Sequence, residues 1–280
     1  MKQDFSRAAA TYDAAAVLAR ETGRRMAERL DYVKLNPARI ADIGCASGDG
    51  IRDLQQRYPA ALPVAVDVSR EMLQQVRGRV PMLQRLARRA PRLLNADARA
   101  LPLAANSFGL VWSNLMLHWL DDPLPALHEM HRVLAVDGLL MFAMLGPDTL
   151  KELRAACREC GIEPPLRQFL DMHDIGDMLV AAGFADPVMD MEMLTLTYAG
   201  SHAARGLLRD QRHLGVRDAL LGHLPWREWR RVFAASVGRH AGDVLPASFE
   251  IVYGHAWKPA PRQIDDGRAI IRFEKRPTKP

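Results

Sequence analysis

The first residues whose types and spacing could do chemistry form the pattern Asp42-x-Gly44-x-Ala46-x-Gly48. A short apolar run precedes this pattern and a helical pattern follows it, which predicts a turn between a strand and a helix. Glycines let backbone approach a ligand closely, and the following helix offers unpaired N–H groups and the positive end of its dipole. Because turns everywhere use glycine, the pattern predicts a cofactor loop only if other residues support it.

Two acids further along the chain could hold a nucleoside. Asp67 lies 19 residues after Gly48, close to the roughly 20-residue separation that places an acid on ribose hydroxyls. Asp97 could accept a hydrogen bond from an adenine amino group, while the small Ala98 leaves room for the ring. The cofactor-binding residues predicted in this way are Asp42, Gly44, Ala46, Gly48, Asp67, Val68, Met72, Asp97, Ala98 and Asn114.

The elements that must position these residues alternate along the chain. Strands are expected over 38–44, 62–67, 92–96, 109–115 and 138–145, and helices over 49–58, 69–79 and 122–135, with Ser69 as an N-cap. Later segments predict helices over 148–160 and 173–183 and a strand pair over 187–198 and 249–257. Such alternation predicts an α/β fold with a doubly wound, mostly parallel seven-stranded sheet that binds ligands at its carboxyl edge.

The same pattern divides the chain into four parts. Alanine-rich helices over 1–36 should form an N-terminal cap ahead of the α/β domain, which covers 37–198. Residues 199–246 are too long for a hairpin connection and predict a helical insertion that acts as a lid. The final strand and a tail cover 247–280, and the strand-like segment 269–273 has no assigned place.

Composition indicates a globular, cytoplasmic chain. Hydrophobic residues make up 49% of the 280 residues, aromatic residues make up 6%, and the net charge is +5, so a stacking surface for nucleic acid is not expected. The three cysteines do not form a disulfide framework, and Cys157-x-x-Cys160 lacks the second pair of a zinc site, so we expect no metal. No secretion signal or membrane-spanning run of about 20 apolar residues is evident.

Taken together, these motifs resemble class I S-adenosylmethionine-dependent methyltransferases over residues 38–146. One departure is Ala46, since glycine usually stands at this position of the resembling families, and its Cβ is costly only if φ is positive. A nicotinamide dehydrogenase would need the pattern G-x-G-x-x-G/A. Counted from Gly44, this chain has Asp49 where that pattern requires its last glycine or alanine.

A narrower resemblance covers residues 5–259. Segments 5–13, 112–119, 169–179, 187–190 and 249–257 resemble the malonyl-acyl-carrier-protein O-methyltransferase family of biotin synthesis. The resemblance implies methylation of the free carboxylate of a malonyl thioester by S-adenosylmethionine, leaving S-adenosylhomocysteine. Candidates for holding that carboxylate are Tyr12, Asn114, His118, Trp119 and an arginine of the lid, because their O–H and N–H groups can donate to it.

Acyl carrier proteins are acidic, so the resemblance also implies a basic docking surface. Arg205, Arg209, Arg212 and Arg217 are candidates for it, although solvated faces explain most charge runs. Two alternatives stay open. Residues 146–154 also resemble a mitochondrial complex I assembly factor that hydroxylates an arginine, and a methyltransferase of a quinone or a small acid would use the same cofactor fold.

Overall fold

Parallel pairing of strands dominates the computed structural model, which describes residues 2–86, 89–199, 203–213, 224–237 and 244–261. Seven strands form one sheet in the order β3-β2-β1-β4-β5-β7-β6. The strands are β1 (Arg39–Ile43), β2 (Leu62–Asp67), β3 (Arg92–Asn95), β4 (Phe108–Asn114), β5 (Leu134–Leu145), β6 (Ala185–Ala199) and β7 (Val244–Trp257). β1 to β5 pair in parallel, and β7 runs antiparallel between β5 and β6. The predicted α/β class and seven-stranded sheet are confirmed.

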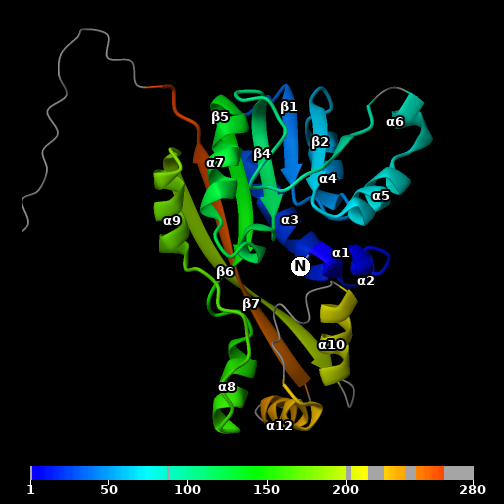
Figure 1. Ribbon diagram of the computed structural model, residues 1–280, viewed down its shortest axis with the longest axis vertical. Helices are drawn as coiled ribbons and strands as arrows, with labels where there is room; N and C mark the ends of the chain where they lie inside the picture. The colour runs from blue at the N-terminus through cyan, green and yellow to red at the C-terminus, as the bar shows by residue number, and fades with distance from the viewer. Residues whose placement is uncertain (1, 87–88, 200–202, 214–223, 238–243, 262–280) are drawn as a thin grey trace, which may run out of the picture.

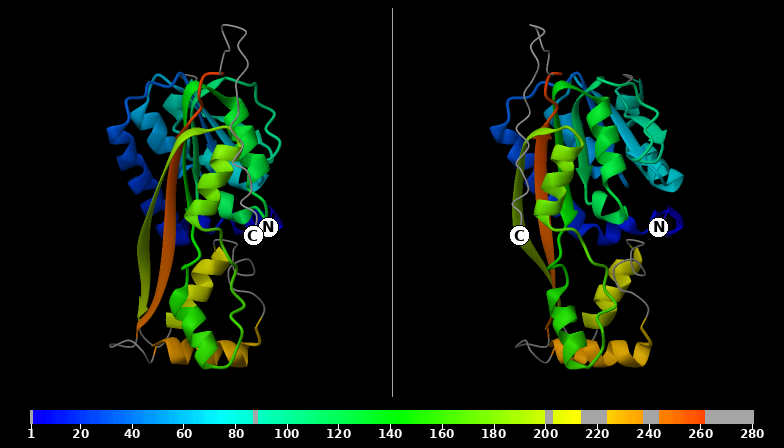
Figure 2. Two further views of the ribbon diagram at one scale, coloured as in Figure 1. Left: turned by 90° about the vertical axis from the view of Figure 1, so that its left-hand side faces the viewer. Right: turned by 60° about the vertical axis from the view of Figure 1, so that its left-hand side comes forward.

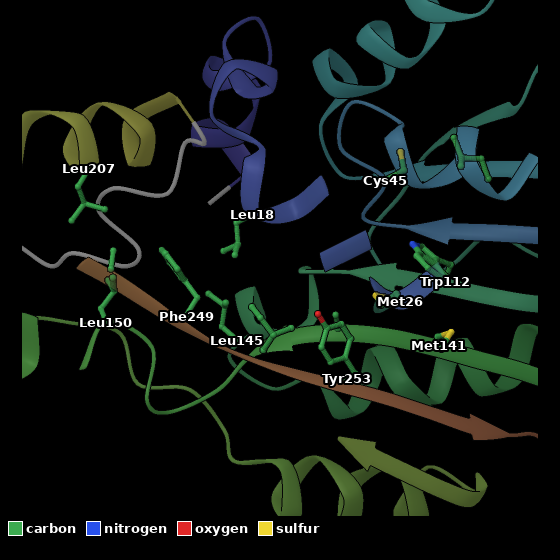
Figure 3. Packing of buried hydrophobic residues seen from close by; sticks show 14 of the residues in the cluster. Leu18, Met26, Cys45, Trp112, Met141, Leu145, Leu150, Leu207, Phe249 and Tyr253 are labelled. Carbon is green, nitrogen blue, oxygen red and sulfur yellow. The ribbon is translucent and has the colours of Figure 1, made fainter. Parts of the chain in front are cut away.

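Helices cover both faces of this sheet (Figures 1 and 2). The helices that follow the parallel strands are α4 (Asp49–Arg57), α5 (Arg70–Arg79), α6 (Met82–Leu86) and α7 (Leu124–Val133), and α9 (Met172–Ala181) precedes β6. α4 and α5 pack in one core cluster with Trp112 of the sheet, whereas α7 and α9 pack in a second cluster with Phe142. Figure 3 shows part of the first cluster, which continues along β7 through Tyr253 and Phe249.

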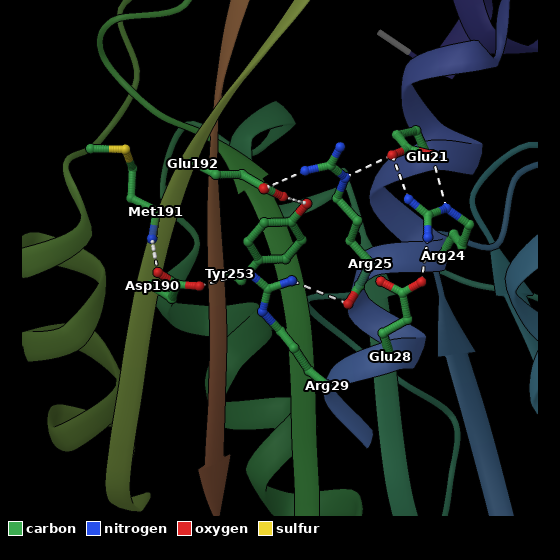
Figure 4. A network of polar contacts seen from close by, with 9 residues as sticks. All are labelled: Glu21, Arg24, Arg25, Glu28, Arg29, Asp190, Met191, Glu192 and Tyr253. Atoms are coloured by element: carbon green, nitrogen blue, oxygen red, sulfur yellow. Dashed lines mark hydrogen bonds and ion pairs between the residues drawn. The ribbon is translucent and has the colours of Figure 1, made fainter. Parts of the chain in front are cut away.

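The N-terminal segment forms α1 (Lys2–Ala8), α2 (Tyr12–Ala15), α3 (Val17–Arg29) and the 3-10 turn η1 (Leu30–Tyr32). α1 and α2 lie at the carboxyl end of the parallel strands (Figure 1). α3 packs along β4 and β5, and ion pairs connect it to β6. Arg25 pairs with Glu192 at 2.5 Å and Arg29 pairs with Asp190 at 2.6 Å, while the Arg29 guanidinium lies 3.8 Å from the centre of the Tyr253 ring (Figure 4).

β6 and β7 extend beyond the rest of the sheet and carry the remaining helices. α8 (Lys151–Glu159) packs against α12 (Trp226–Val237), and α10 (Ala203–His213) lies against α2 and β6. In Figures 1 and 2 these three helices lie beyond the carboxyl edge of the parallel strands. In sequence, α10 and α12 stand between β6 and β7, the place expected for the insertion.

Several boundaries differ from the predictions for physical reasons. β7 begins at Val244 rather than 249, because β6 pairs with it as far as Ala199. Pro246 is tolerated there, since β5 pairs with β7 only from Ile251 onward and the missing N–H is not needed. β5 begins at Leu134, four residues early, across a bulge opposite β4. α6 lies in the arginine-rich connection for which no element was predicted.

No helix among the described residues combines the length and the apolar composition needed to cross a membrane. The predicted segment 269–273 lies outside the described residues.

Candidate active site

A cavity of about 1280 Å³, partly open to solvent, lies between the N-terminal cap and the carboxyl ends of the parallel strands. Its walls contain most of the residues predicted from sequence. The predicted cofactor-binding residues that line it are Gly44, Ala46, Asp67, Val68, Met72, Asp97, Ala98 and Asn114. The predicted substrate-binding residues that line it include Tyr12, His118 and Trp119. Asp42 lines a neighbouring cavity instead, and Gly48 lines neither of the two.

The loop between β1 and α4 uses left-handed backbone three times. Gly44 has φ +80°, Ala46 has φ +44° and Gly48 has φ +91°. A Cβ on Gly44 would lie 2.4 Å from Cγ of Met116, so only glycine fits where the loop passes under the segment after β4. The alanine therefore stands in a conformation that L-residues with a Cβ adopt at a cost. The sequence left the sign of this φ open, and the structure gives it as positive.

Asp67 joins the two segments that border the cavity. Its Oδ2 accepts a hydrogen bond from the Ala46 N–H at 2.9 Å, and its Oδ1 accepts one from the Ser69 N–H at 2.8 Å. Ser69 in turn caps α5, as predicted, by accepting from the Met72 N–H at 3.2 Å. Burial raises the pKa of Asp67, and the hydrogen bonds from these backbone N–H groups oppose that shift. A carboxylate has about four lone-pair sites, so Asp67 can still accept a hydrogen bond from a ligand.

Asp97 borders the cavity from the end of β3 and is already paired. The Arg99 guanidinium donates to both of its oxygens, with a shortest distance of 2.7 Å, and lowers the pKa of the carboxyl group. Arg99 itself lines the cavity and was not predicted from sequence. Any ligand group that donates a hydrogen bond to Asp97 would therefore share this carboxylate with the Arg99 guanidinium.

The second cavity, of about 790 Å³, adjoins the first, since Tyr12, Ala19, Gly44 and Asn114 line both. Asp42 lies 2% exposed in its wall, and burial with the charge of Asp67 raises the pKa of Asp42 to about 8.

Two buried polar atoms face this region without a protein partner, namely Nε1 of Trp112 and Oδ1 of Asn114. The other amide atom of Asn114, Nδ2, donates to the Ala19 carbonyl at 2.7 Å. A donor and an acceptor left unpaired beside a buried carboxyl group are costly unless a ligand or water pairs them.

His118 and Trp119 form the 3-10 turn η2 (Leu117–Trp119) at the other side of the main cavity. The Leu145 N–H donates to Nδ1 of His118 at 3.3 Å, so the proton of the neutral ring stands on Nε2. Burial and the Arg167 charge lower the pKa of His118 to about 3. The ring therefore offers one neutral N–H donor. It packs between Trp119 and Phe169, with ring centres 4.7 Å and 5.5 Å away.

Tyr12 reaches the cavity from α2, and burial raises the pKa of its hydroxyl group, so it is a neutral donor as well. Phe5 of α1 meets Trp119 edge-on at 5.7 Å between ring centres. The N-terminal segment thus supplies walls of the cavity.

Residues from β6, β7 and α10 close the far side and were not predicted as site residues. They are Leu196, Tyr198, Phe249 and Asp210. Leu196 and Tyr198 stand two apart on one face of β6, a spacing visible in the sequence. Their approach to the cavity depends on the register and reach of the long strand pair, which the sequence does not show.

Comparisons with known proteins agree with this geometry. A family model described as a methyltransferase domain matches residues 41–142. The malonyl-[acyl-carrier protein] O-methyltransferase of Gallionella capsiferriformans is 50% identical over 279 residues, which cover 97% of this chain and 94% of that protein. The chain belongs to this methyltransferase family. The protein of the same name from Laribacter hongkongensis is 48% identical, with 98% of this chain and 94% of the relative covered.

Solved structures show the same fold at low identity. The YcgJ protein of Bacillus subtilis has a TM-score of 0.59 and 15% identity, covering 85% of this chain and 99% of that one. A phosphoethanolamine N-methyltransferase of Haemonchus contortus, solved with S-adenosylhomocysteine, has a TM-score of 0.51 and 17% identity, covering 86% of this chain and 53% of that one.

S-Adenosylmethionine is the methyl donor of such a domain, and the residues present fit it. The unpaired atoms of Trp112 and Asn114 beside Asp42 suit the charged amino-acid end of the cofactor. Asp67 has lone pairs for ribose hydroxyls, and the cavity continues past Val68 and Ala98 for a base. Among the described residues, no group of three His, Cys, Asp or Glu side chains could hold a metal ion.

Proposed function

We propose that this chain transfers the methyl group of S-adenosylmethionine to the free carboxylate of a malonyl group carried on an acyl carrier protein, an early step of biotin synthesis. The observation that carries the proposal is the near full-length identity of 48–50% to two proteins that bear this name. The cytoplasm is the place we propose for this reaction, which leaves S-adenosylhomocysteine and needs no metal.

The reaction asks for positioning rather than for a general base. A malonyl carboxylate is ionised at pH 7, and S-adenosylmethionine supplies an electrophilic methyl group on a sulfonium. The protein has to exclude water and hold the reacting atoms about 3 to 3.5 Å apart. Apolar side chains at the substrate end of the cavity, such as Phe5, Leu145 and Phe249, suit this task.

The substrate carboxylate meets neutral donors in this proposal. His118 Nε2–H is such a donor, and Tyr12 and Trp119 carry two more in the same cavity. Neutral donors orient a carboxylate without neutralising it, so it keeps its nucleophilicity. A guanidinium from the lid would grip the group more tightly but would also lower its reactivity.

The cofactor is proposed to lie across both cavities. Asp42 and Asn114 would hold its amino-acid end above Gly44 and Gly48, and Asp67 would accept from its ribose. The adenine base would be bordered by Val68, Met72, Asp97 and Ala98. Ala46 would lie close to the centre of the cofactor.

The lid and the docking surface are part of the proposal. In this proposal the chain has four parts, which are residues 1–36, 37–198, 199–246 and 247–280. α10 carries the basic surface that would bind the acidic carrier. Arg205 and Arg209 are exposed there, the second beside Asp210 at 3.3 Å. The side chain of Arg212 and the whole of Arg217 lie outside the described residues.

The alternatives have less support. No relative named above is an arginine hydroxylase, and the identity to the malonyl-carrier enzymes does not favour that reaction. Methylation of a quinone or a small acid keeps the cofactor site and changes only the acceptor.

A panel of acceptors tests the proposal. The purified chain is mixed with S-adenosylmethionine labelled in its methyl group and with malonyl-carrier, acetyl-carrier, a free dicarboxylic acid or a quinone precursor. We expect label in the malonyl-carrier alone, because the acetyl group lacks a free carboxylate. Label in the quinone or the free acid, with none in the malonyl-carrier, would replace the acceptor and keep the cofactor assignment.

A further inference from the structure

The N-terminal cap is joined by polar contacts to the two segments that border the cofactor cavity. Ser6 on α1 hydrogen-bonds to Ser69, the N-cap of α5, at 3.1 Å between hydroxyl oxygens. Asp13 on α2 accepts a hydrogen bond from the Ser47 hydroxyl at 2.6 Å and forms an ion pair with Arg79 of α5. Ser47 belongs to the cofactor loop and is 1% exposed.

Arg79 completes a small network around this carboxylate. Its guanidinium also donates to the Ser47 carbonyl at 3.2 Å and to Asp49 at 3.3 Å. Asp13 therefore stands where three segments meet: the cap, the loop after β1 and the helix after β2. We propose that Asp13 is a positioning residue that holds the cap closed over bound S-adenosylmethionine, and so controls how fast the cofactor and its product leave.

The cap depends on such contacts. α1 has 7 residues and α2 has 4, and helices of this length do not persist without tertiary contacts. Among the described side chains, the fully buried residues of α1 and α2 and of the turns beside them are the small Ala8, Ala9, Ala15 and Ala16, while Phe5 is partly buried against the core. The polar contact to the cofactor loop therefore adds to the packing that keeps this cap in place.

The position of the cap matters to the cofactor because cap residues are walls of its cavity. Tyr12, the neighbour of Asp13, lines both cavities, and Leu18 and Ala19 line the main cavity from the start of α3. A contact that favours the closed cap must tighten cofactor binding, and bound cofactor must order the cap by the same free energy. Asp13 touches neither the reacting atoms nor the carrier in this account, so it should govern binding rather than the methyl transfer itself.

The proposal depends on the cofactor assignment and not on the acceptor. Its test is the dissociation rate of S-adenosylhomocysteine, followed by tryptophan fluorescence with no carrier present. We expect Asp13→Ala to raise this rate about tenfold, as for the loss of a charge-assisted contact. KM for S-adenosylmethionine should rise by a similar factor, while kcat stays within about twofold of the wild type.

Two further variants separate a specific contact from a general loosening. Asp13→Asn keeps an acceptor for Ser47 but removes the ion pair, so its dissociation rate should be intermediate. The side chains of Asp13 and Arg79 are 36% and 34% exposed, so salt should screen the pair and speed dissociation in the wild type but not in Asp13→Asn. In a double-mutant cycle, the effects of Asp13→Ala and Arg79→Met should be less than multiplicative, because each single variant already removes the ion pair between them. Any remaining effect of Arg79→Met reflects its bonds to the Ser47 carbonyl and to Asp49.

Asp190→Ala is the matched control. It removes the ion pair between Arg29 of α3 and Asp190 of β6 (Figure 4), and neither of these residues lines the two cavities. Three results would each overturn the proposal: an Asp13→Ala dissociation rate within twofold of the wild type, an equal change in Asp190→Ala, or single effects that multiply in the double variant. Failure of methyl transfer to the malonyl-carrier would leave this binding measurement intact.

Discussion

Ala46 holds a left-handed backbone conformation in the cofactor loop, with φ +44°, while its N–H donates to Asp67. A residue with a Cβ adopts this region at a cost of about 1 kcal/mol or more, which glycine does not have. Glycine also gives the unfolded chain more freedom, and this offsets part of the gain. We expect Ala46→Gly to raise the free energy of unfolding by about 0.5 kcal/mol and to tighten S-adenosylhomocysteine binding.

Calorimetric titration and denaturant unfolding measure these two effects. Ala46→Val serves as the comparison, because a β-branched side chain is strained further at positive φ and should weaken both. Weaker cofactor binding in Ala46→Gly would mean that the Cβ itself contacts the ligand.

His118 leads to a second prediction at the scale of single residues. Because the pKa of His118 is lowered to about 3, its ring stays neutral from pH 5 to 9 and its Nε2–H remains a donor. His118→Leu should lower kcat/KM for malonyl-carrier about tenfold to a hundredfold through one lost hydrogen bond to a charged group. His118→Gln, which can accept from Leu145 and donate to substrate, should retain most activity.

The pH profile is the check on this assignment. Wild-type kcat/KM should show no inflection near 6.5, the ordinary pKa of histidine. An inflection there that disappears in His118→Gln would show that the ring titrates during the reaction.

The acids that border the main cavity could be predicted from the sequence, because their spacing and their positions after strands are visible there. Asp67 and Asp97 do border the cavity, and so does the loop residue Gly44. The unpaired Nε1 of Trp112 and the tautomer of His118 could not be predicted from the sequence, because each depends on which neighbours lie within hydrogen-bond distance in the folded protein.

At the scale of elements, α10, which we propose as part of a lid, packs closely against β6. A Cβ on Gly206 would lie 2.9 Å from Cδ1 of Tyr198, so the ring of that tyrosine lies directly against the helix. Asp210 is one turn further along and lines the cavity beside the same tyrosine.

Gly206→Ala should therefore displace the lid without touching the cofactor loop. We expect KM for malonyl-carrier to rise severalfold while S-adenosylhomocysteine affinity is unchanged. Gly78→Ala is the matched control, because a Cβ at this position of α5 meets nothing within 4 Å. Equal KM values for both variants would show that the lid tolerates the extra methyl group.

Most elements were predictable because hydrophobic periodicity and caps are local signals. β2 matches its predicted range of 62–67, and Ser69 caps α5 as expected. The extension of β7 to Val244 depends on its pairing with Ala199 of β6, 45 residues earlier in the chain, which no local pattern reports. The packing of α10 on Tyr198 joins positions only eight residues apart, but it depends on tertiary packing rather than on a local sequence signal.

At the scale of the whole molecule, stability should depend on pH through Asp42. Its pKa is raised to about 8 by burial and by Asp67, against about 3.9 in an unfolded chain. The native state therefore keeps a proton that the unfolded state has lost. The resulting stability is complete below about pH 4 and is lost as pH rises through about 8.

Denaturant unfolding without cofactor at pH 6 and pH 9 measures this loss. Asp42→Asn removes the ionisation, so its free energy of unfolding should fall less than that of the wild type between the two pH values. Parallel changes in the two proteins would place the titration elsewhere.

The central claim is that the chain esterifies a malonyl carboxylate on its carrier, and the intact mass of the carrier tests it most directly. After incubation with the purified chain and S-adenosylmethionine, we predict that malonyl-carrier gains the mass of one CH₂ group and that fragmentation places it on the malonyl carboxylate. An unchanged mass while the chain still binds S-adenosylhomocysteine, or a methyl group found anywhere else on the carrier, would contradict the account.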